Sequence, residues 1–367
     1  MKKVICVLGT LAICGLGFSQ IPITEWTAQQ EIIPSNPTQM AGAVVVSDKL
    51  YILGGNDYLD GDTNRVYRFA VDQTTGGLSI PDEMTSMPVA PPSNYAYINA
   101  QSVATSNRIY IAGGGYNATA PNRNNVTHIG VDASGNFTDA AWLESDAFSG
   151  GYDPELGAAA IPANGYLYAW GGDGNTVAVF DMCVYAKVNA DGSLGAWQSG
   201  TTLPTTSWFP AACSIGNNII MSIGIINDTS NANASDKVYV CQVNTDGTMG
   251  AWVEQTGAAL PQPLYGTQLV AVNNTVFALG GRTTGGVTQN CVYRAVFNPA
   301  TGTLGAWDTV TDVQLPDGVR YHCAVYHAKS ARIIIVSIRR ASDALISNEA
   351  YISSPLFASN VQDWTIY

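Results

Sequence analysis

The side chains best suited to binding a ligand are aromatic and charged residues that lie between the apolar runs of the sequence. Aromatic rings stack on the C–H faces of sugars, and polar side chains bond to sugar hydroxyl groups in the ring plane. This combination predicts a site for a neutral, polyhydroxylated ligand, with the alternative that the same side chains only plug an opening in the fold. The candidate ligand-binding residues are Tyr97, Tyr152, Asp173, Trp208, Tyr265, Arg282, Arg320, Tyr321, His322 and Arg339.

Signals for catalysis are weaker than those for binding. The histidines are His128, His322 and His327, and we expect His128 and His327 to lie away from the candidate site. An acid or base must lie within hydrogen-bond reach of the proton that it moves. Spacing along the chain does not establish that reach, so an enzyme stays the alternative to a binding protein.

One loop has acidic residues that alternate enough to suggest a calcium site. These are Asp57, Asp60 and Asp62, with Asn64 following. The spacing of an EF-hand loop is absent, which favours a solvated loop. We therefore predict neither a metal nor a cofactor.

Composition and charge exclude several classes of partner. Of the 367 residues only 12% are charged, 46% are hydrophobic, and the formal net charge is −12. The apolar content is too high for a disordered chain. An acidic chain has few cations to neutralise phosphates, which argues against nucleic acid and against an anionic membrane surface.

The N-terminus has the pattern of a secretory signal. Met1, Lys2 and Lys3 precede an apolar run that ends at Phe18, and small residues then favour cleavage before Gln20. We expect residues 1–19 to be removed and 20–367 to form one secreted, periplasmic or cell-surface domain without a membrane span. A lipoprotein anchored through Cys14 is the alternative. Five widely spaced cysteines then remain, and we expect them to be buried thiols.

One sequence unit recurs along the chain. Its parts are an apolar run ending in Gly-Gly, as in VFALGG, a run holding Val-Tyr, as in CVYRAVF, and a turn leading to Gly-Ala-Trp. Trp197, Trp252 and Trp307 follow one another at intervals of 55 residues. Short apolar runs bounded by Gly, Asn, Asp and Pro are typical of strands, and this period is typical of a propeller blade. In the fifth unit we expect strands at 267–272, 275–281, 291–297 and 303–308.

These motifs resemble the kelch repeat, and the Gly-Ala-Trp form is similar to bacterial kelch proteins of the galactose-oxidase-like group. The resemblance implies an all-β, six-bladed β-propeller of the kelch type, with four antiparallel strands per blade. It also implies that the repeat tryptophans fill the wedges between blades. Arg320-Tyr321-His322 is similar to a copper-ligand segment of galactose oxidases, but the chain lacks the other residues of that centre. Some kelch propellers are sialic-acid epimerases, which use carboxylates and arginines at the mouth of the propeller. The resemblance implies that Glu155, Arg282, Arg320 and Arg339 could serve in the enzyme alternative.

Strand direction predicts where a site can lie. If strands alternate in direction, the loops after the Gly-Gly strands and the links between units share one face, which we call the loop face. The segments at 22–33 and 361–367 both resemble the fourth strand of a unit. With both of them the chain would have seven such strands, whereas six blades need six, and the sequence does not decide which segment closes the ring.

Taken together, these features predict an exported, non-catalytic binding module that recognises a glycan or a cell-surface protein through its loop face. The alternatives are a carbohydrate-active enzyme that uses the same face, and a structural scaffold whose opening is shut.

Overall fold

The computed structural model describes residues 22–33, 37–56, 63–88, 101–114, 123–152, 157–173, 179–227, 230–309 and 312–357. The predicted signal, the acidic residues of the suggested calcium loop, Tyr97, Glu155 and the segment 361–367 lie outside these ranges. Apart from three short 3-10 helices (Ser149–Gly151, Asn231–Asn233 and Thr256–Ala258), the regular structure is all strand. No helix in this part of the chain is long and apolar enough to cross a membrane.

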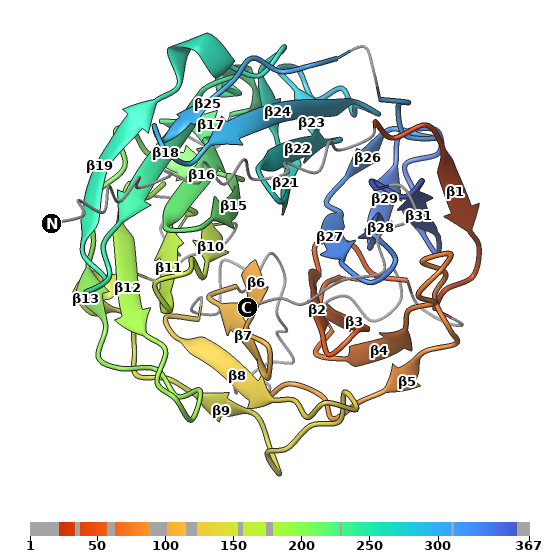
Figure 1. Ribbon diagram of the computed structural model, residues 1–367, viewed down its shortest axis with the longest axis horizontal. Coiled ribbons are helices and arrows are strands. Elements are labelled where there is room, and N and C mark those ends of the chain that lie inside the picture. Colours follow the sequence, from red (N-terminus) through yellow and green to blue (C-terminus); the bar gives the residue numbers. More distant parts are fainter. Residues whose placement is uncertain are drawn as a thin grey trace, which may run out of the picture.

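The described residues form six four-stranded antiparallel sheets, which are arranged around a central axis (Figure 1). We number them by the chain order of their innermost strands. From the innermost strand outwards, sheet 1 consists of β2 (Gly42–Val46), β3 (Lys49–Leu53), β4 (Val66–Ala70) and β5 (Asp82–Glu83), and sheet 2 of β6 (Gln101–Ala104), β7 (Arg108–Ala112), β8 (Val126–Gly130) and β9 (Leu143–Glu144). Sheet 3 consists of β10 (Ala158–Ala160), β11 (Tyr166–Trp170), β12 (Cys183–Lys187) and β13 (Gln198–Ser199), and sheet 4 of β15 (Ala211–Ile215), β16 (Asn218–Ser222), β18 (Val238–Val243) and β19 (Met249–Glu254). Sheet 5 consists of β21 (Gln268–Val272), β22 (Thr275–Leu279), β24 (Val292–Asn298) and β25 (Thr303–Leu304), and sheet 6 of β27 (Cys323–His327), β28 (Arg332–Val336), β31 (Ala350–Ser353) and β1 (Trp26–Gln29).

The innermost strands close a ring. Each of β2, β6, β10, β15, β21 and β27 contacts the next in chain order, and β27 in turn contacts β2. The second strand of each sheet is buried along nearly its whole length, as in β22 and β7. Buried and exposed residues do not alternate along these strands, because neighbouring sheets cover both faces of each sheet. The hydrophobic core therefore lies in the wedges between sheets, and these features identify the fold as a β-propeller.

The N-terminal segment supplies the outermost strand of sheet 6. β1 pairs antiparallel with β31, with Trp26 opposite Ser353 and Gln29 opposite Ala350. Around this strand, the Val313 amide donates to the Ile23 carbonyl at 2.9 Å, and the Ile23 amide donates to the Asp312 carboxylate. Strands from the two ends of the described chain thus share one sheet, which ties the ring shut.

Five tryptophans bridge neighbouring sheets at the outer edge. Each lies in or beside an outermost strand, and its indole N–H donates to a residue that follows the outermost strand of the preceding sheet. The bonds run from Trp142 to the Thr85 carbonyl (3.0 Å), from Trp197 to the Ser145 hydroxyl (3.3 Å), from Trp252 to the Thr201 carbonyl (3.2 Å), from Trp307 to the Ala258 carbonyl (2.8 Å) and from Trp26 to the Val313 carbonyl (2.9 Å). Trp26 therefore occupies the same structural position as the repeat tryptophans, although it comes from the other end of the chain.

A tyrosine in the second strand links three of the sheets to a turn in the next sheet. The tyrosine hydroxyl donates a hydrogen bond to a glycine carbonyl in each case. The pairs are Tyr51 with Gly135 (2.6 Å), Tyr110 with Gly192 (2.9 Å) and Tyr168 with Gly247 (2.8 Å). These glycines adopt φ between 82° and 92°. Such a backbone favours glycine, so the Asp-Gly and Ser-Gly turns of the sequence place a carbonyl where the tyrosine can reach it.

Replacing Tyr110 by Phe should lower the free energy of unfolding by about 1–2 kcal/mol, because the Gly192 carbonyl loses a buried donor. Urea denaturation measures this change. The matched control is Tyr166→Phe, since the Tyr166 ring is half-buried and we expect its loss of a hydroxyl to change stability by less than about 0.5 kcal/mol. Equal effects of the two substitutions would contradict the proposed inter-sheet role of the Tyr110 hydroxyl.

Candidate functional site

Three additional small sheets form at the edge where the innermost strands begin. They pair the link that enters a sheet with the segment that follows its second strand. The pairs are β14 (Ser207–Trp208) with β17 (Ile225–Ile226), β20 (Leu264–Tyr265) with β23 (Arg282–Thr283), and β26 (Val319–Arg320) with β29 (Ile338–Arg340), which also pairs with β30 (Ile346–Ser347). Links and loops of sheets 4, 5 and 6 therefore meet on one face of the molecule, the loop face.

The register of these small sheets brings candidate residues together in pairs. Tyr265 lies directly opposite Arg282, and Arg320 lies directly opposite Arg339. Trp208 lies opposite Ile225, and its indole N–H donates to the Asp173 carboxylate at 2.9 Å. That bond holds the half-buried indole in a single orientation on the loop face.

A positive φ recurs two residues before the innermost strand in four of the described links. Met40, Phe209, Gly266 and Tyr321 occupy equivalent places in their links, and their φ values are 55°, 54°, 60° and 55°. Residues other than glycine are disfavoured in this region, by on the order of 1–3 kcal/mol, and such strain gathers at functional sites. The sequence analysis did not identify Phe209. Aligning the links on the first residue of the innermost strand would have shown that it is equivalent to Tyr321.

Phe209 is the centre of an aromatic cluster on this face. Its ring centroid lies 4.6 Å from that of Trp208, 5.8 Å from that of Tyr265 and 5.8 Å from that of Tyr321. Phe209 and Tyr321 enter sheets 4 and 6, so their contact passes over sheet 5, where Gly266 has no side chain. This cluster fills part of the opening, while Trp208, Phe209 and Tyr321 stay half-exposed.

Arg282 and Arg320 lie against the tyrosines of the cluster. The Arg282 guanidinium carbon is 5.6 Å from the Tyr265 ring centroid, and its Nη1 donates to the Tyr321 hydroxyl at 3.3 Å. The Arg320 guanidinium carbon is 5.9 Å from the Tyr321 ring centroid, and its Nη1 donates to the Thr288 hydroxyl at 2.7 Å. Both geometries are those of cation–π pairs, which align a guanidinium over a ring face.

Arg339 extends this group of arginines towards sheet 1. Its Nη1 donates to the Gln39 side-chain carbonyl at 3.3 Å, and its Nε donates to the Ala344 carbonyl at 3.0 Å. Burial lowers the pKa of Arg320, and the positive charges of Arg282 and Arg339 lower it further. The three guanidinium groups are therefore close enough to repel one another.

Three candidate residues are buried: Tyr152 and His322 lie in the interior, and Tyr265, 1% exposed, packs against Phe209. Tyr152 is fully buried, packs against Phe148 and Phe180, and donates its hydroxyl to the Gly171 carbonyl at 2.9 Å. His322 is buried behind Gly280. Burial lowers the pKa of His322 to about 4, so the ring is neutral. Tyr152 and His322 follow links that turn inwards, which their spacing in the sequence did not reveal.

The other histidines lie away from this face, as expected. His128 in β8 contacts the Arg108 guanidinium at 2.9 Å, and His327 at the far end of β27 contacts the Ser330 hydroxyl at 2.8 Å. Within the described residues, no group of three or more His, Cys, Asp or Glu side chains could hold a metal ion.

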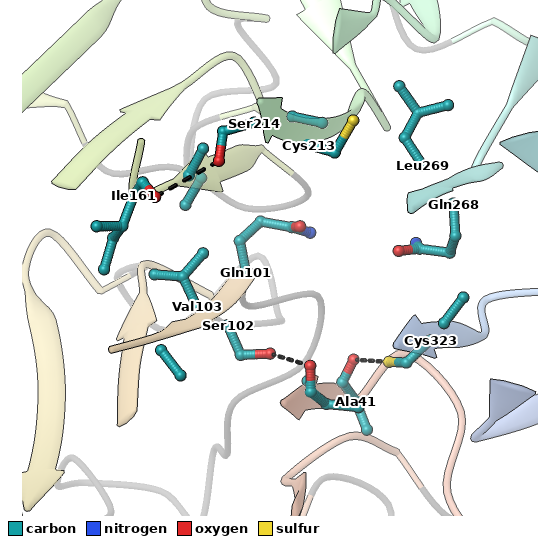
Figure 2. A pocket seen from close by; sticks show the side chains of 17 residues that line it. Ala41, Gln101, Ser102, Val103, Ile161, Cys213, Ser214, Gln268, Leu269 and Cys323 are labelled. Carbon is teal, nitrogen blue, oxygen red and sulfur yellow. Dashed lines mark hydrogen bonds between the residues drawn. The ribbon is translucent and has the colours of Figure 1, made fainter. Parts of the chain in front are cut away.

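A cavity of about 270 Å³ lies on the axis of the ring, among the innermost strands of all six sheets (Figure 2). Gln101 and Gln268 extend into it from sheets 2 and 5, and its remaining lining is small, apolar or hydroxyl-bearing. Cys213 also lines it, and burial raises the pKa of that thiol to about 12. None of the described side chains that line this cavity is charged.

The sequence matches no protein-family model and no curated protein. Among solved structures, the chain is similar to the one described as "Structure of YjhT", with a TM-score of 0.61. The likeness covers 87% of this chain and 96% of that chain at 12% sequence identity. At that identity the likeness bears on fold alone, and together with the ring of four-stranded antiparallel sheets it shows that the chain has a β-propeller fold.

Proposed function

We propose that this chain is an exported carbohydrate-binding protein built as a six-bladed propeller of the kelch type. Each of the six sheets would be one blade, residues 1–19 a secretory signal, and residues 20–367 a single domain. The recurring Gly-Gly, Val-Tyr and Gly-Ala-Trp motifs, the closed ring of innermost strands and the bridging tryptophans support this assignment.

The observation that carries the binding function is the meeting of aromatic and polar side chains on one face. Trp208, Phe209 and Tyr321 offer half-exposed ring surface, and Asp173, Arg282 and Arg339 stand beside them. Ring faces take the C–H side of a sugar, while planar guanidinium and carboxylate groups take its hydroxyls. Because hydrogen bonds already hold the Trp208 indole and the Arg282 and Arg339 guanidinium groups, little side-chain entropy is lost when a ligand binds.

The same geometry favours binding over catalysis. The carboxylate of Asp173 accepts the indole N–H of Trp208, and the His322 imidazole is buried and neutral. In the described part of the loop face, no carboxylate forms an ion pair with Arg282, Arg320 or Arg339, which a sugar-modifying enzyme could use as an acid–base pair. The enzyme alternative is tested in the same experiment.

Glycan-array binding by the chain from residue 20 onwards tests the proposal. We expect saccharide binding that Trp208→Ala weakens at least about tenfold, since a stacked aromatic ring is lost. The control is Val296→Ser, which changes an exposed residue of β24 on the outer part of sheet 5. Absence of binding by the unmodified chain, or equal binding by Trp208→Ala, would refute the function. NMR spectra of the bound sugars that changed with time would instead establish an enzyme.

A further inference from the structure

The three arginines of the loop face form a concentration of positive charge in an acidic chain. Arg320 and Arg339 lie directly opposite each other in the β26–β29 pair. Arg282 reaches the same place from β23 and bonds to Tyr321, the residue next to Arg320. Like charges directly opposite on paired strands destabilise a sheet, and the chain as a whole carries a net charge of −12. A neutral or oppositely charged pair would be expected here if the residues served only to hold the fold.

The guanidinium groups of this cluster have no counter-charge among the described residues. Their donors go to neutral oxygen atoms: the carbonyls of Gly286 and Ala344, the hydroxyls of Tyr321 and Thr288, and the amide of Gln39. Elsewhere in the described chain the usual arrangement is an ion pair. Examples are Arg68 with Asp82, Arg108 with Asp139, Arg123 with Glu144, Arg294 with Asp308 and Arg340 with Asp343.

Two buried polar atoms beside the cluster have unused hydrogen-bonding capacity. The Nε of Arg320 and the hydroxyl of Tyr265 are buried and make no hydrogen bond to the described protein. Tyr265 is 1% exposed, and a buried donor without a partner costs on the order of 1–3 kcal/mol. An oxyanion held by the cluster would supply both the missing negative charge and the missing acceptors.

We infer that Arg282, Arg320 and Arg339 bind the anionic group of an acidic saccharide, a carboxylate or a sulfate ester, whose ring lies against the neighbouring aromatic side chains. Arginine suits this role because its planar fork matches two oxygens of a carboxylate or sulfate. The acidic remainder of the chain would repel a polyanion, so the geometry favours one anionic group on a small ligand. This inference rests on the proposed carbohydrate-binding function and specifies the class of sugar.

The test is a calorimetric titration of the chain with three ligands that share one sugar ring. These are methyl glucoside, methyl glucuronide and methyl glucoside 6-sulfate, with inorganic sulfate titrated separately at constant ionic strength. We expect one of the acidic sugars to bind at least about tenfold more tightly than the neutral one, and the comparison between them distinguishes a carboxylate from a sulfate site.

Variants then assign the effect to the cluster. Arg320→Gln and Arg339→Gln should abolish the preference for the acidic sugar, while Lys187→Gln, which removes an exposed charge on β12, should keep it. Without ligand, Arg339→Gln should leave the melting temperature unchanged or raise it, because a repulsion is removed; a purely structural arginine would lower it. Tyr265→Phe is a second variant, which should fold normally and bind the acidic sugar more weakly.

The outcomes separate this inference from the proposed function. Equal affinity for the neutral and acidic sugars, or a preference that survives in both arginine variants, would overturn the anionic site and leave carbohydrate binding standing. Binding of inorganic sulfate through the arginines without binding of any sugar would keep the anionic site and overturn its saccharide ligand. Tighter binding of an oligoglutamate peptide than of either acidic sugar would also overturn the saccharide ligand. Absence of binding by all four anionic and neutral probes would overturn the inference itself.

Discussion

A chain that begins at residue 31, and therefore lacks β1, should lose its cooperative thermal transition. Sheet 6 would keep its three strands from the C-terminal part of the described chain, but the strand that joins the two ends of the ring would be gone. Ile23, which is fully buried, and the Trp26 bond to Val313 would be lost with it. Their combined contribution approaches the total stability of an ordinary domain, which is about 5–15 kcal/mol.

Differential scanning calorimetry of the chain from residue 20 and of the chain from residue 31 measures this effect. A single substitution tests the same contact without a deletion: Ile23→Ala should lower the free energy of unfolding by about 2–5 kcal/mol. Thr27→Ala is the control, because Thr27 is an exposed residue of β1, four positions after Ile23, and its effect should stay within about 0.5 kcal/mol. A chain from residue 31 with an unchanged melting temperature would show that β1 does not close the ring.

His322 should make the protein sensitive to mild acid, with a loss of roughly 3 kcal/mol of stability between pH 7 and pH 4. Burial lowers its pKa to about 4 in the folded protein, whereas an unfolded chain has a histidine pKa of about 6.5. Between pH 4 and pH 6.5, His322 is therefore protonated in the unfolded state and unprotonated in the folded state. Stability falls as the pH drops below about 6.5, and the loss is complete near pH 4.

Urea denaturation at closely spaced pH values measures this loss. His128 and His327 also have lowered pKa values through burial and contribute to the same trend, so the comparison is between the natural chain and His322→Leu. The difference in unfolding free energy between the two proteins should shift by roughly 3 kcal/mol from pH 7 to pH 4 in favour of the variant. A difference that stays constant across this range would mean that His322 is protonated in the folded protein.

Local features of the fold were well predicted from the sequence, because they depend on residues near one another in the chain. The expected strands at 267–272 and 275–281 correspond to β21 and β22, and that at 291–297 corresponds to β24 within one residue at each end. The fourth strand, expected at 303–308, is shorter and forms β25 at Thr303–Leu304. Outer strands have only one paired neighbour, so their ends are less strongly determined than those of inner strands.

The structure gathers some of the candidate residues on one face and not others. Trp208, Tyr265, Tyr321 and the three arginines gather on one face, because their positions repeat within the unit and strand alternation sets their side of the sheet. Tyr152 and His322 have similar spacing but point into the interior. Which way a link turns its side chains depends on the backbone φ at single residues and on the packing of adjacent sheets. Neither can be deduced from the spacing of aromatic residues.

The amino-acid sequence by itself determined the repeating unit and its four short strands, since both follow from period, turn residues and apolar runs. Only the tertiary structure decided that the segment around Trp26 is the outer strand of sheet 6. The two terminal segments resemble each other as strands, and the choice depends on which edge the closed ring leaves unpaired. The tertiary structure also decided that Arg282, Arg320 and Arg339 lie close together without a counter-charge among the described residues. Arg282 and Arg339 are 57 positions apart in the chain, and they come close only because sheets 5 and 6 pack side by side.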